Sequence, residues 1–364
     1  MNPRHVVVMA DDEELLDDVV RLAAAAGAEL ERVPDAAGLR RRWSAAGLVL
    51  LDAAAARAAA PARLGRRDGV VVLCRGEPPS TLWERAVAVG AEHVVSLPEG
   101  EEWLVGTLSD AADAAGSEPR TGPGRVVSVV GGRGGAGASV LAAAVAVRAG
   151  EDGTRVLLVD CDPLGGGLDL VVGAEELEGL RWPELALGSG RVAAASLHEA
   201  LPSPDGVLTV LSCDRSGGSP APDAAAAVVE AGKRAGETVV CDLPRHLTDA
   251  AAAVVDVSDL TVLVVPAEVR AVASAARVAE QVAAHGAALA VVVRGPAPGG
   301  LDGDDVARAL GLEVLACVAP EPGLAAAMDR GKVPGVRRGP LRDTASAVLA
   351  ALDGAALSGG RAAS

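Results

Sequence analysis

The sequence predicts an α/β protein with two domains, each built on a mostly parallel β-sheet. Short apolar runs alternate with alanine-rich stretches along the chain, a pattern typical of parallel strands that alternate with covering helices. Hydrophobic residues make up 50% of the 364 residues, so the chain can bury a sizeable core. Phenylalanine and tyrosine are absent, so valine, leucine and alanine must fill that core.

A segment rich in glycine and proline separates the two domains. From Gly116 to Gly124 the sequence GSEPRTGPG contains three glycines, two prolines and little apolar content, which is typical of a linker. We therefore predict a first domain over 1–115, a linker over 116–124, a second domain over 125–352 and a flexible tail over 353–364.

Apolar runs bounded by turn residues predict the strands of both domains. Five runs precede the linker, which suits a flavodoxin-like sheet, and seven follow it, which fits a larger doubly wound sheet. The first five runs start at His5, Ala28, Gly47, Gly69 and His93, and the other seven start at Val126, Val156, Gly206, Thr238, Leu260, Leu289 and Glu313.

A glycine-rich turn follows the first strand of the second domain and leads directly into a helix, in VVSVVGGRGGAGASVLAAAVAV. Glycines let backbone N–H groups turn inward around phosphate oxygens, and the helix presents the positive end of its dipole. The alternative is a strand-to-helix turn that binds no ligand. The predicted nucleotide-binding residues are Gly132, Arg133, Gly134, Gly135, Ala136, Gly137, Ala138, Ser139 and Val140.

The loop fits the phosphate-loop pattern G-x-x-x-x-G-K-[ST] except at one position. Ala138 stands where the pattern has lysine, and Ser139 follows it. A charge-assisted phosphate contact contributes about 1.5–3 kcal/mol, so its loss predicts about ten- to hundredfold weaker nucleotide binding. We expect hydrolysis to be impaired as well, because the missing charge would also stabilise the transition state.

Three aspartates stand at the ends of apolar strands in the second domain. Asp160 and Asp162 end the strand of VLLVDCDPLGGGLD, and Asp242 ends that of TVVCDLP. Because the carboxyl ends of parallel strands share one edge of a sheet, these carboxylates should lie beside the glycine-rich loop. A carboxylate at Asp242 could hold a magnesium-bound water there.

From Arg125 to about Leu352, this order of motifs resembles the MinD/ParA superfamily of P-loop ATPases, whose phosphate loop is roughly K-G-G-x-G-K-[ST]. The segment VAPEPGLAAAMDRGKVP from Val318 is similar to the family's I-P-x-D segment and the helix after it. More narrowly, the chain resembles actinobacterial CpaE-like or septum-site-determining proteins, in which a receiver-like domain precedes such a module.

The resemblance implies a role for each matching residue. Arg133 stands where the signature lysine crosses to the partner subunit, and Ser139 matches the hydroxyl that ligates magnesium. Asp160 and Asp162 match the D-x-D-P segment, whose second aspartate positions the attacking water, and Asp242 matches the magnesium-associated aspartate. The implied catalytic residues are Asp162, Asp242 and Arg133, the implied metal ligands are Ser139, Asp160 and Asp242, and the implied cofactors are ATP or ADP with Mg²⁺.

The sequence departs from the family at two further points. Arg133 replaces the signature lysine, and a general drift from lysine to arginine could explain this because only Lys233 and Lys332 remain in the chain. That drift cannot explain Ala138. The adenine-contacting asparagine is also missing, with Val293 in its place.

The start of the first domain, HVVVMADDEELLDDVVRLAAAAGAEL, resembles a response-regulator receiver. Asp11 and Asp12 end the first strand and Asp52 ends the third, so these acids together could bind magnesium and accept a phosphoryl group, with Asp52 as the candidate phosphoacceptor. Alternatively, Asp11 or Asp12 caps a helix and Asp52 only ends a strand.

Two further parts of a receiver's phosphorylation switch are missing from the sequence. The position of the hydroxyl residue after the fourth strand holds Cys74 or Arg75, and Leu97 replaces the lysine expected before Pro98. We therefore favour a receiver-like interaction domain over a phosphorylated one.

The net charge of −16 and the absence of basic runs argue against a nucleic-acid surface. No apolar stretch approaches the roughly 20 residues of a membrane span, so we expect a cytoplasmic protein. The tail has one arginine, so we expect peripheral association with the inner face of the membrane only through a partner. The scattered cysteines indicate buried thiols.

The resemblance implies a homodimeric, nucleotide-binding regulatory or localisation protein. Its process would be placement of the cell division site or assembly of a Tad/Flp-type pilus or secretion system, with protein partners from that machinery. One alternative is a genuine slow ATPase in which Arg133, Asp162 and Asp242 suffice. A second is a ParA-type chromosome-partitioning ATPase, which the negative charge opposes.

Overall fold

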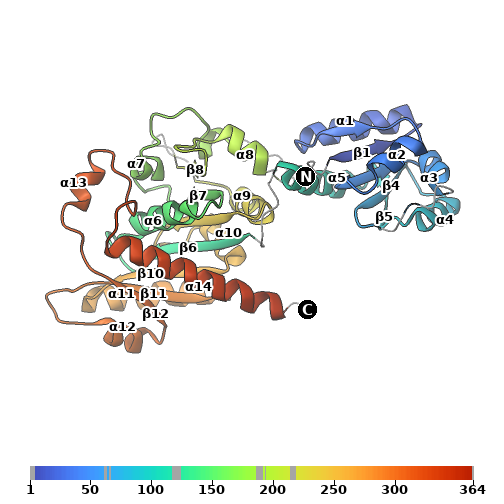
Figure 1. The fold of residues 1–364 in the computed structure, drawn as a ribbon. Helices are drawn as coiled ribbons and strands as arrows, with labels where there is room; N and C mark the ends of the chain where they lie inside the picture. The colour runs from blue at the N-terminus through green and yellow to red at the C-terminus, as the bar shows by residue number, and fades with distance from the viewer. Residues whose placement is uncertain are drawn as a thin grey trace. The chain divides into compact units, whose positions relative to one another are not determined.

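The chain forms two α/β units, which the sequence pattern predicts (Figure 1). The computed structural model describes residues 5–60, 64, 67–116, 124–185, 192, 194–213 and 219–362. The first unit comprises Met1–Thr121 with Gly188–Leu197, and the second comprises Gly122–Leu187 with His198–Ser364. Their boundary after Thr121 falls in the segment predicted as a linker, of which residues 117–123 lie outside the described part.

The amino-terminal unit is a five-stranded sheet with the strand order β2-β1-β3-β4-β5, and its neighbouring strands pair in parallel. This is the order of a flavodoxin-like fold. The helices enclose one apolar core on each face of the sheet. The elements are β1 (Val6–Met9), α1 (Glu13–Ala25), β2 (Leu30–Arg32), α2 (Ala36–Arg42), β3 (Leu48–Leu51), α3 (Ala53–Ala59), β4 (Val70–Arg75), α4 (Ser80–Val89), β5 (His93–Leu97) and α5 (Glu101–Gly116).

The carboxyl-terminal unit is a seven-stranded parallel sheet with the order β12-β11-β10-β6-β9-β7-β8. The strands are β6 (Arg125–Gly131), β7 (Val156–Asp160), β8 (Leu208–Leu211), β9 (Thr238–Leu243), β10 (Leu260–Pro266), β11 (Leu289–Arg294) and β12 (Val314–Val318). The order places β9 between β6 and β7, so the chain crosses from β6 over β9 to β7. The ends of these three strands therefore meet at one place on the sheet edge.

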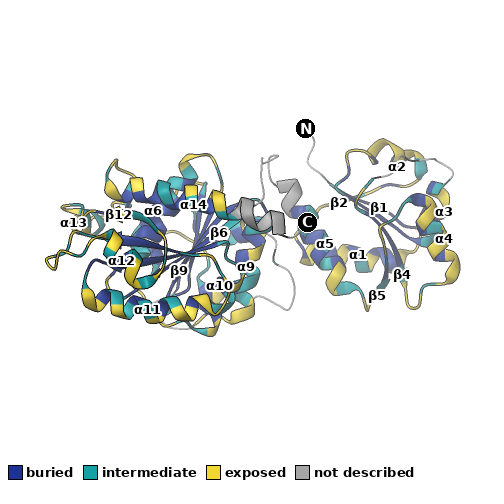
Figure 2. Cartoon of the chain, turned by 90° about the horizontal axis from the view of Figure 1, so that it is seen from below, coloured by how far each residue is buried: buried dark blue, intermediate teal, exposed yellow. Residues whose placement is uncertain are grey.

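Helices cover both faces of this sheet. Helices α6, α7 and α14 contribute buried side chains to one apolar core, whereas α10 and α11 lie on the opposite face from α6 and α14 (Figure 2). The helices are α6 (Ala138–Glu151), α7 (Leu168–Val172), the 3₁₀ helix η2 (Trp182–Glu184), α8 (Ala194–Ala200), α9 (Pro222–Arg234), α10 (Asp249–Val257), α11 (Val269–Ala283), α12 (Gly303–Leu310), α13 (Leu324–Met328) and α14 (Pro340–Ala362).

The last helix differs from the sequence-based expectation. The sequence predicts a flexible tail over 353–364, but α14 continues past Leu352 to Ala362. Leu352 is fully buried and Asp353 forms an ion pair with Arg125 at the start of β6, so the first residues of the expected tail are held against the sheet. No proline follows Leu352 to end the helix.

No helix in the described part of the chain combines the length and the apolar composition that a membrane span requires.

We predict that Leu158→Ala destabilises the carboxyl-terminal unit by about 3 kcal/mol, because it removes a fully buried side chain from β7 and leaves a cavity. Leu170→Ala is the matched control, since Leu170 on α7 is 46% exposed. Hydrogen–deuterium exchange of strand peptides in increasing urea measures the stability of each of the two units separately. Equal losses of stability in both variants would contradict the core that we assign.

Candidate nucleotide-binding site

The glycine-rich turn joins the end of β6 to the start of α6. Gly135 and Gly137 adopt φ values of +71° and +101°, a backbone region that side chains strongly disfavour. Gly132 packs so closely on α11 that a Cβ atom there would lie 2.7 Å from the Cβ of Ala275. Around Gly134, by contrast, a Cβ atom would meet nothing within 4 Å, because this side of the loop is exposed.

The first turn of α6 has backbone N–H groups without a side-chain cap, whose hydrogen bonds an anion could accept. Gly137 is the N-cap residue and has no side chain to accept hydrogen bonds from the first N–H groups of the helix. These donors and the helix dipole therefore face outward together, which is the arrangement that binds phosphate. The methyl group of Ala138, where the lysine is missing, packs against the apolar core instead of reaching toward a ligand.

Asp242 lies directly beside this turn. It ends β9, which pairs with β6, and its side chain lies near that of Ser139 on α6. Burial raises the pKa of Asp242 to about 8, an effect that the nearby Ser139 hydroxyl opposes and the charges of Asp160 and Asp162 reinforce. A divalent cation beside this carboxylate would favour its ionised form.

Asp160 pairs in register with Asp242 on the neighbouring strand, but its carboxylate is already engaged within the chain. One oxygen accepts the N–H of Asp162 at 3.0 Å, and the other accepts the N–H of Leu168 at 3.0 Å. The second oxygen also accepts the N–H of Cys213 at 3.3 Å. Burial raises the pKa of Asp160, and these backbone hydrogen bonds oppose that rise. The carboxylate thus holds the loop between β7 and α7 in shape.

Asp162 lies on the loop that Asp160 holds. Its side chain is half-buried, and one of its oxygens accepts the N–H of Leu164 at 3.0 Å. The structure thus brings Ser139, Asp160, Asp162 and Asp242 to one edge of the sheet. Among the described residues, no group of three His, Cys, Asp or Glu side chains is arranged to hold a metal ion. Magnesium sites with nucleotides commonly use only one or two carboxylates plus substrate phosphates, which the pair of Ser139 and Asp242 could complement.

Arg133 points to a carboxylate of its own chain. Its guanidinium forms a two-pronged ion pair with Glu268, the N-cap residue of α11, at 3.0 and 3.1 Å. The two side chains are 37% and 40% exposed, so solvent screens the pair and its contribution to stability is at most about 1 kcal/mol. To reach a partner's nucleotide, Arg133 would have to release Glu268.

A second arginine contacts the loop, and the sequence reasoning missed it. Arg294 ends β11, and its Nη1 donates hydrogen bonds to the carbonyl oxygens of Gly135 at 3.1 Å and Ala136 at 3.2 Å. The neighbouring Val293, which holds the place of the expected asparagine, is buried in the strand. A basic residue at the carboxyl end of a strand, on the same sheet edge as the loop, was the signal that could have found Arg294.

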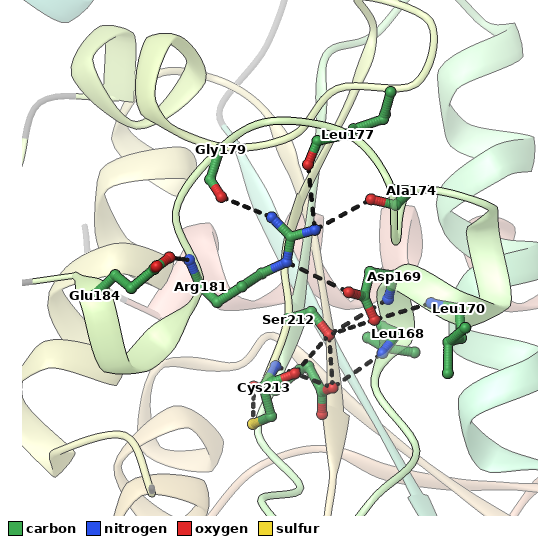
Figure 3. Close-up of polar contacts among 11 residues, drawn as sticks. Leu168, Asp169, Leu170, Ala174, Leu177, Gly179, Arg181, Glu184, Ser212 and Cys213 are labelled. Carbon is green, nitrogen blue, oxygen red and sulfur yellow. Dashed lines mark hydrogen bonds and ion pairs between the residues drawn. The ribbon is translucent and has the colours of Figure 1, made fainter. Parts of the chain in front are cut away.

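Behind the loop of Asp160 lies a buried polar network that the sequence also did not reveal (Figure 3). The hydroxyl of Ser212 lies 3.3 Å from both an Asp160 oxygen and an Asp169 oxygen. Arg181 donates to the other oxygen of Asp169 at 3.3 Å and to the carbonyl groups of Ala174 and Gly179 at 3.1 and 2.7 Å. The network therefore connects the strand end at Asp160 to the loop that leads to η2.

Trp182 in η2 makes a further contact with Asp160, through the backbone of that residue. Its indole Nε1 donates a buried hydrogen bond of 2.6 Å to the carbonyl oxygen of Asp160. The backbone and the side chain of Asp160 are thus fixed by different partners, which explains how an irregular loop can hold a defined shape at the sheet edge.

In the amino-terminal unit, Asp52 is 4% exposed and accepts backbone hydrogen bonds on both oxygens. One oxygen accepts the N–H groups of Asp11 and Asp12 at 2.7 and 2.9 Å, and the other accepts the N–H of Ala55 at 2.6 Å. Asp12 itself caps α1. The three acids therefore lie close together, but backbone N–H groups occupy both oxygens of Asp52, and Asp12 caps a helix.

These features define the class of protein. The carboxyl-terminal unit has the fold of the MinD/ParA P-loop ATPases, and a receiver-like domain precedes it. It is similar to the MinD cell division protein of Aquifex aeolicus, with 22% identity and a TM-score of 0.52 over 62% of this chain and 97% of that one. It is also similar to a ParA family ATPase from Chlorobium tepidum TLS, with 13% identity and a TM-score of 0.51 over 62% and 98% of the two chains.

A narrower relationship covers nearly the whole chain. Residues 8–120 match the family model described as the Rv3660c-like, CheY-like N-terminal domain. Rv3660c of Mycobacterium tuberculosis strain H37Rv and MT3760 of strain CDC 1551 are each 45% identical over 345 residues, which cover 94% of this chain and 97% of each relative. The chain belongs to the Rv3660c-like family, and both the receiver-like domain and the MinD/ParA-like fold predicted from the sequence are confirmed.

We predict that Arg181→Met lowers the stability of the carboxyl-terminal unit by about 3 kcal/mol, because it removes the cation beside a buried carboxylate. The side chains of Arg181 and Asp169 are only 13% and 2% exposed. Arg308→Gln is the control, since Arg308 is 74% exposed. Urea unfolding read by hydrogen exchange of β7 and α7 measures the loss, and equal stability of both variants would refute the role of this network.

We predict that Asp52 does not accept a phosphoryl group, because its carboxylate is buried and both of its oxygens are hydrogen-bonded. Intact-mass spectrometry after incubation with acetyl phosphate and Mg²⁺ should show no adduct. An adduct in the wild type that disappears in Asp52→Asn would prove the prediction wrong.

Proposed function

We propose that this protein is a regulatory or localisation protein that binds ATP or ADP with Mg²⁺ and hydrolyses ATP slowly or not at all. The observation that carries this proposal is the phosphate loop, whose backbone cradle is intact although the lysine position holds Ala138. The positive φ values of Gly135 and Gly137 and the helix start without a side-chain cap at Gly137 are the features of a phosphate loop that this turn keeps.

The residues at the sheet edge fit a nucleotide in most respects. The N–H groups of the loop and of the first turn of α6 would bind phosphate oxygens. Ser139 and Asp242, which lie near one another, would hold Mg²⁺, and the metal when bound would neutralise phosphate charge. We propose that Asp160 acts as a positioning residue and not as the metal ligand that the resemblance implies, since both of its oxygens accept hydrogen bonds from the chain.

Weak or absent hydrolysis follows from the charges that remain. Replacement of the lysine by Ala138 removes a contact that would strengthen in the transition state. Arg133, the residue that would cross to a partner subunit, is paired with Glu268 in its own chain. Asp162 is retained at the loop edge and could still orient a water molecule, which is the observation that favours a slow ATPase as the second candidate function.

The process in which the protein acts is proposed from its relatives. One structural neighbour is the MinC:MinD cell division protein complex of Aquifex aeolicus, with a TM-score of 0.52. We propose that this chain, like a MinD-type protein, forms a homodimer and acts with protein partners in division-site placement or in pilus or secretion assembly. It would reach the membrane only through a partner, and the net charge of −16 speaks against a chromosome-partitioning role on DNA.

The test is equilibrium binding of ATP with Mg²⁺ by calorimetry, with turnover followed in the same sample. We expect the wild type to bind about ten- to hundredfold more weakly than Ala138→Lys, because the variant restores one charge-assisted phosphate contact. We also expect turnover to stay near background in the wild type and to rise in the variant.

One control variant and one refuting outcome complete this experiment. Ser139→Ala should remove the dependence of binding on Mg²⁺ while leaving the fold intact, since the serine lies at the start of α6 and not in its core. Failure of both the wild type and Ala138→Lys to bind ATP or ADP would refute nucleotide binding and leave the domain as an interaction scaffold.

A further inference from the structure

Arg294 brings a guanidinium group onto the phosphate loop from another part of the sheet. The residue ends β11, which is separated from β6 by β10. Its Nη1 contacts the carbonyl oxygens of Gly135 and Ala136. A Cβ atom built on Gly137 would lie 3.6 Å from the same nitrogen. The cation is therefore located beside the residue that starts α6, next to the position where the lysine is missing.

The charge of Arg294 is not balanced by a neighbouring acid. In the described part of the chain, no carboxylate lies within ion-pair distance of its guanidinium, whereas Arg133 on the same loop is paired with Glu268. Only Nη1 of Arg294 makes hydrogen bonds to described residues, which leaves Nε and Nη2 with donors to offer. A half-buried guanidinium without a neighbouring carboxylate keeps its full positive charge beside the loop.

The hydrogen bonds of Arg294 also act on the loop itself. Each peptide group has its carbonyl and its N–H on opposite sides, so a cation that holds the carbonyl oxygens of Gly135 and Ala136 on one side favours N–H groups on the other. The same side chain can thus fix the loop and place a positive charge at its rim.

We propose that Arg294 supplies the positive charge that the phosphate loop has lost at Ala138: from the carbonyl side of the loop it directs the loop N–H groups toward the phosphate groups of the nucleotide, and its charge strengthens their binding. This inference rests on the proposed function. It assigns a binding residue to the nucleotide site from a strand end that does not belong to the phosphate-loop motif.

The competing role for Arg294 is that of a brace that only holds the loop carbonyls. Two variants separate these roles. Arg294→Gln keeps a hydrogen-bond donor but removes the charge, and Arg294→Lys keeps the charge but removes the two-pronged geometry. Arg308→Gln is the control for loss of an arginine charge on the same unit, because Arg308 is 74% exposed and lies on α12.

The experiment measures binding of ADP with Mg²⁺ by calorimetry at low and moderate salt, for the wild type and the three variants. We expect Arg294→Gln to weaken binding about tenfold or more and to reduce its salt dependence, because one positive charge beside the phosphate site is lost. Arg294→Lys should retain most of the affinity and the salt dependence, and Arg308→Gln should match the wild type. Hydrogen exchange of the loop in the absence of ADP measures separately whether each Arg294 variant loosens the loop.

The outcomes distinguish this inference from the proposed function. If the wild type binds ADP and Arg294→Gln binds it equally well, the inference is wrong and the proposed function stands. If Arg294→Lys loses as much affinity as Arg294→Gln and both loosen the loop without changing the salt dependence, Arg294 is a brace and the inference is also wrong. If neither the wild type nor Ala138→Lys binds ADP, the proposed function fails and this inference fails with it.

Discussion

The carboxylate of Asp160 is the constraint on which the geometry of the sheet edge depends. It stands at the end of a buried strand, where an unpaired charge would be costly, and the chain satisfies it by folding the following loop back so that N–H groups of Asp162 and Leu168 reach its oxygens. Ser212 from the end of β8 adds a hydroxyl contact. One buried acid therefore fixes the loop that carries Asp162 and joins it to the end of β8.

Polar contacts, and not the apolar core, connect the carboxylate of Asp160 to the neighbouring loops and hold those loops in place. Asp169 shares Ser212 with Asp160, and Arg181 joins Asp169 to three backbone carbonyl groups of the next loop. In a core made of valine, leucine and alanine, without phenylalanine or tyrosine, apolar side chains offer little that is directional. Hydrogen bonds to buried groups are what give this irregular segment a single shape.

The elements of the fold could be predicted from the sequence because each strand is a short apolar run with its own turn signals, as in Val126 to Gly131 or Leu260 to Pro266. The glycine-rich turn between β6 and α6 could be predicted for the same reason, since strand, turn and helix are contiguous. Arg294 and Arg181 could not, because their roles depend on which distant segments the fold places beside them. The end of α14 was missed since Asp353 is held by Arg125, a contact between opposite ends of the domain.

The distribution of charge around the loop explains how a phosphate loop can lose its lysine and keep its shape. In a phosphate loop without ligand, the inward N–H groups repel a cation, so a lysine there contributes to binding and catalysis and little to folding. The loop shape comes from the glycines at 135 and 137 and from carbonyl contacts on its outer side. Loss of the lysine is therefore tolerated by the fold, whereas Asp160 is bound into the structure by several hydrogen bonds and cannot be removed without disturbing the loop after β7. The residues with structural roles at this edge and the missing lysine belong to different parts of the sheet edge, which is why the MinD/ParA-like fold persists without that lysine.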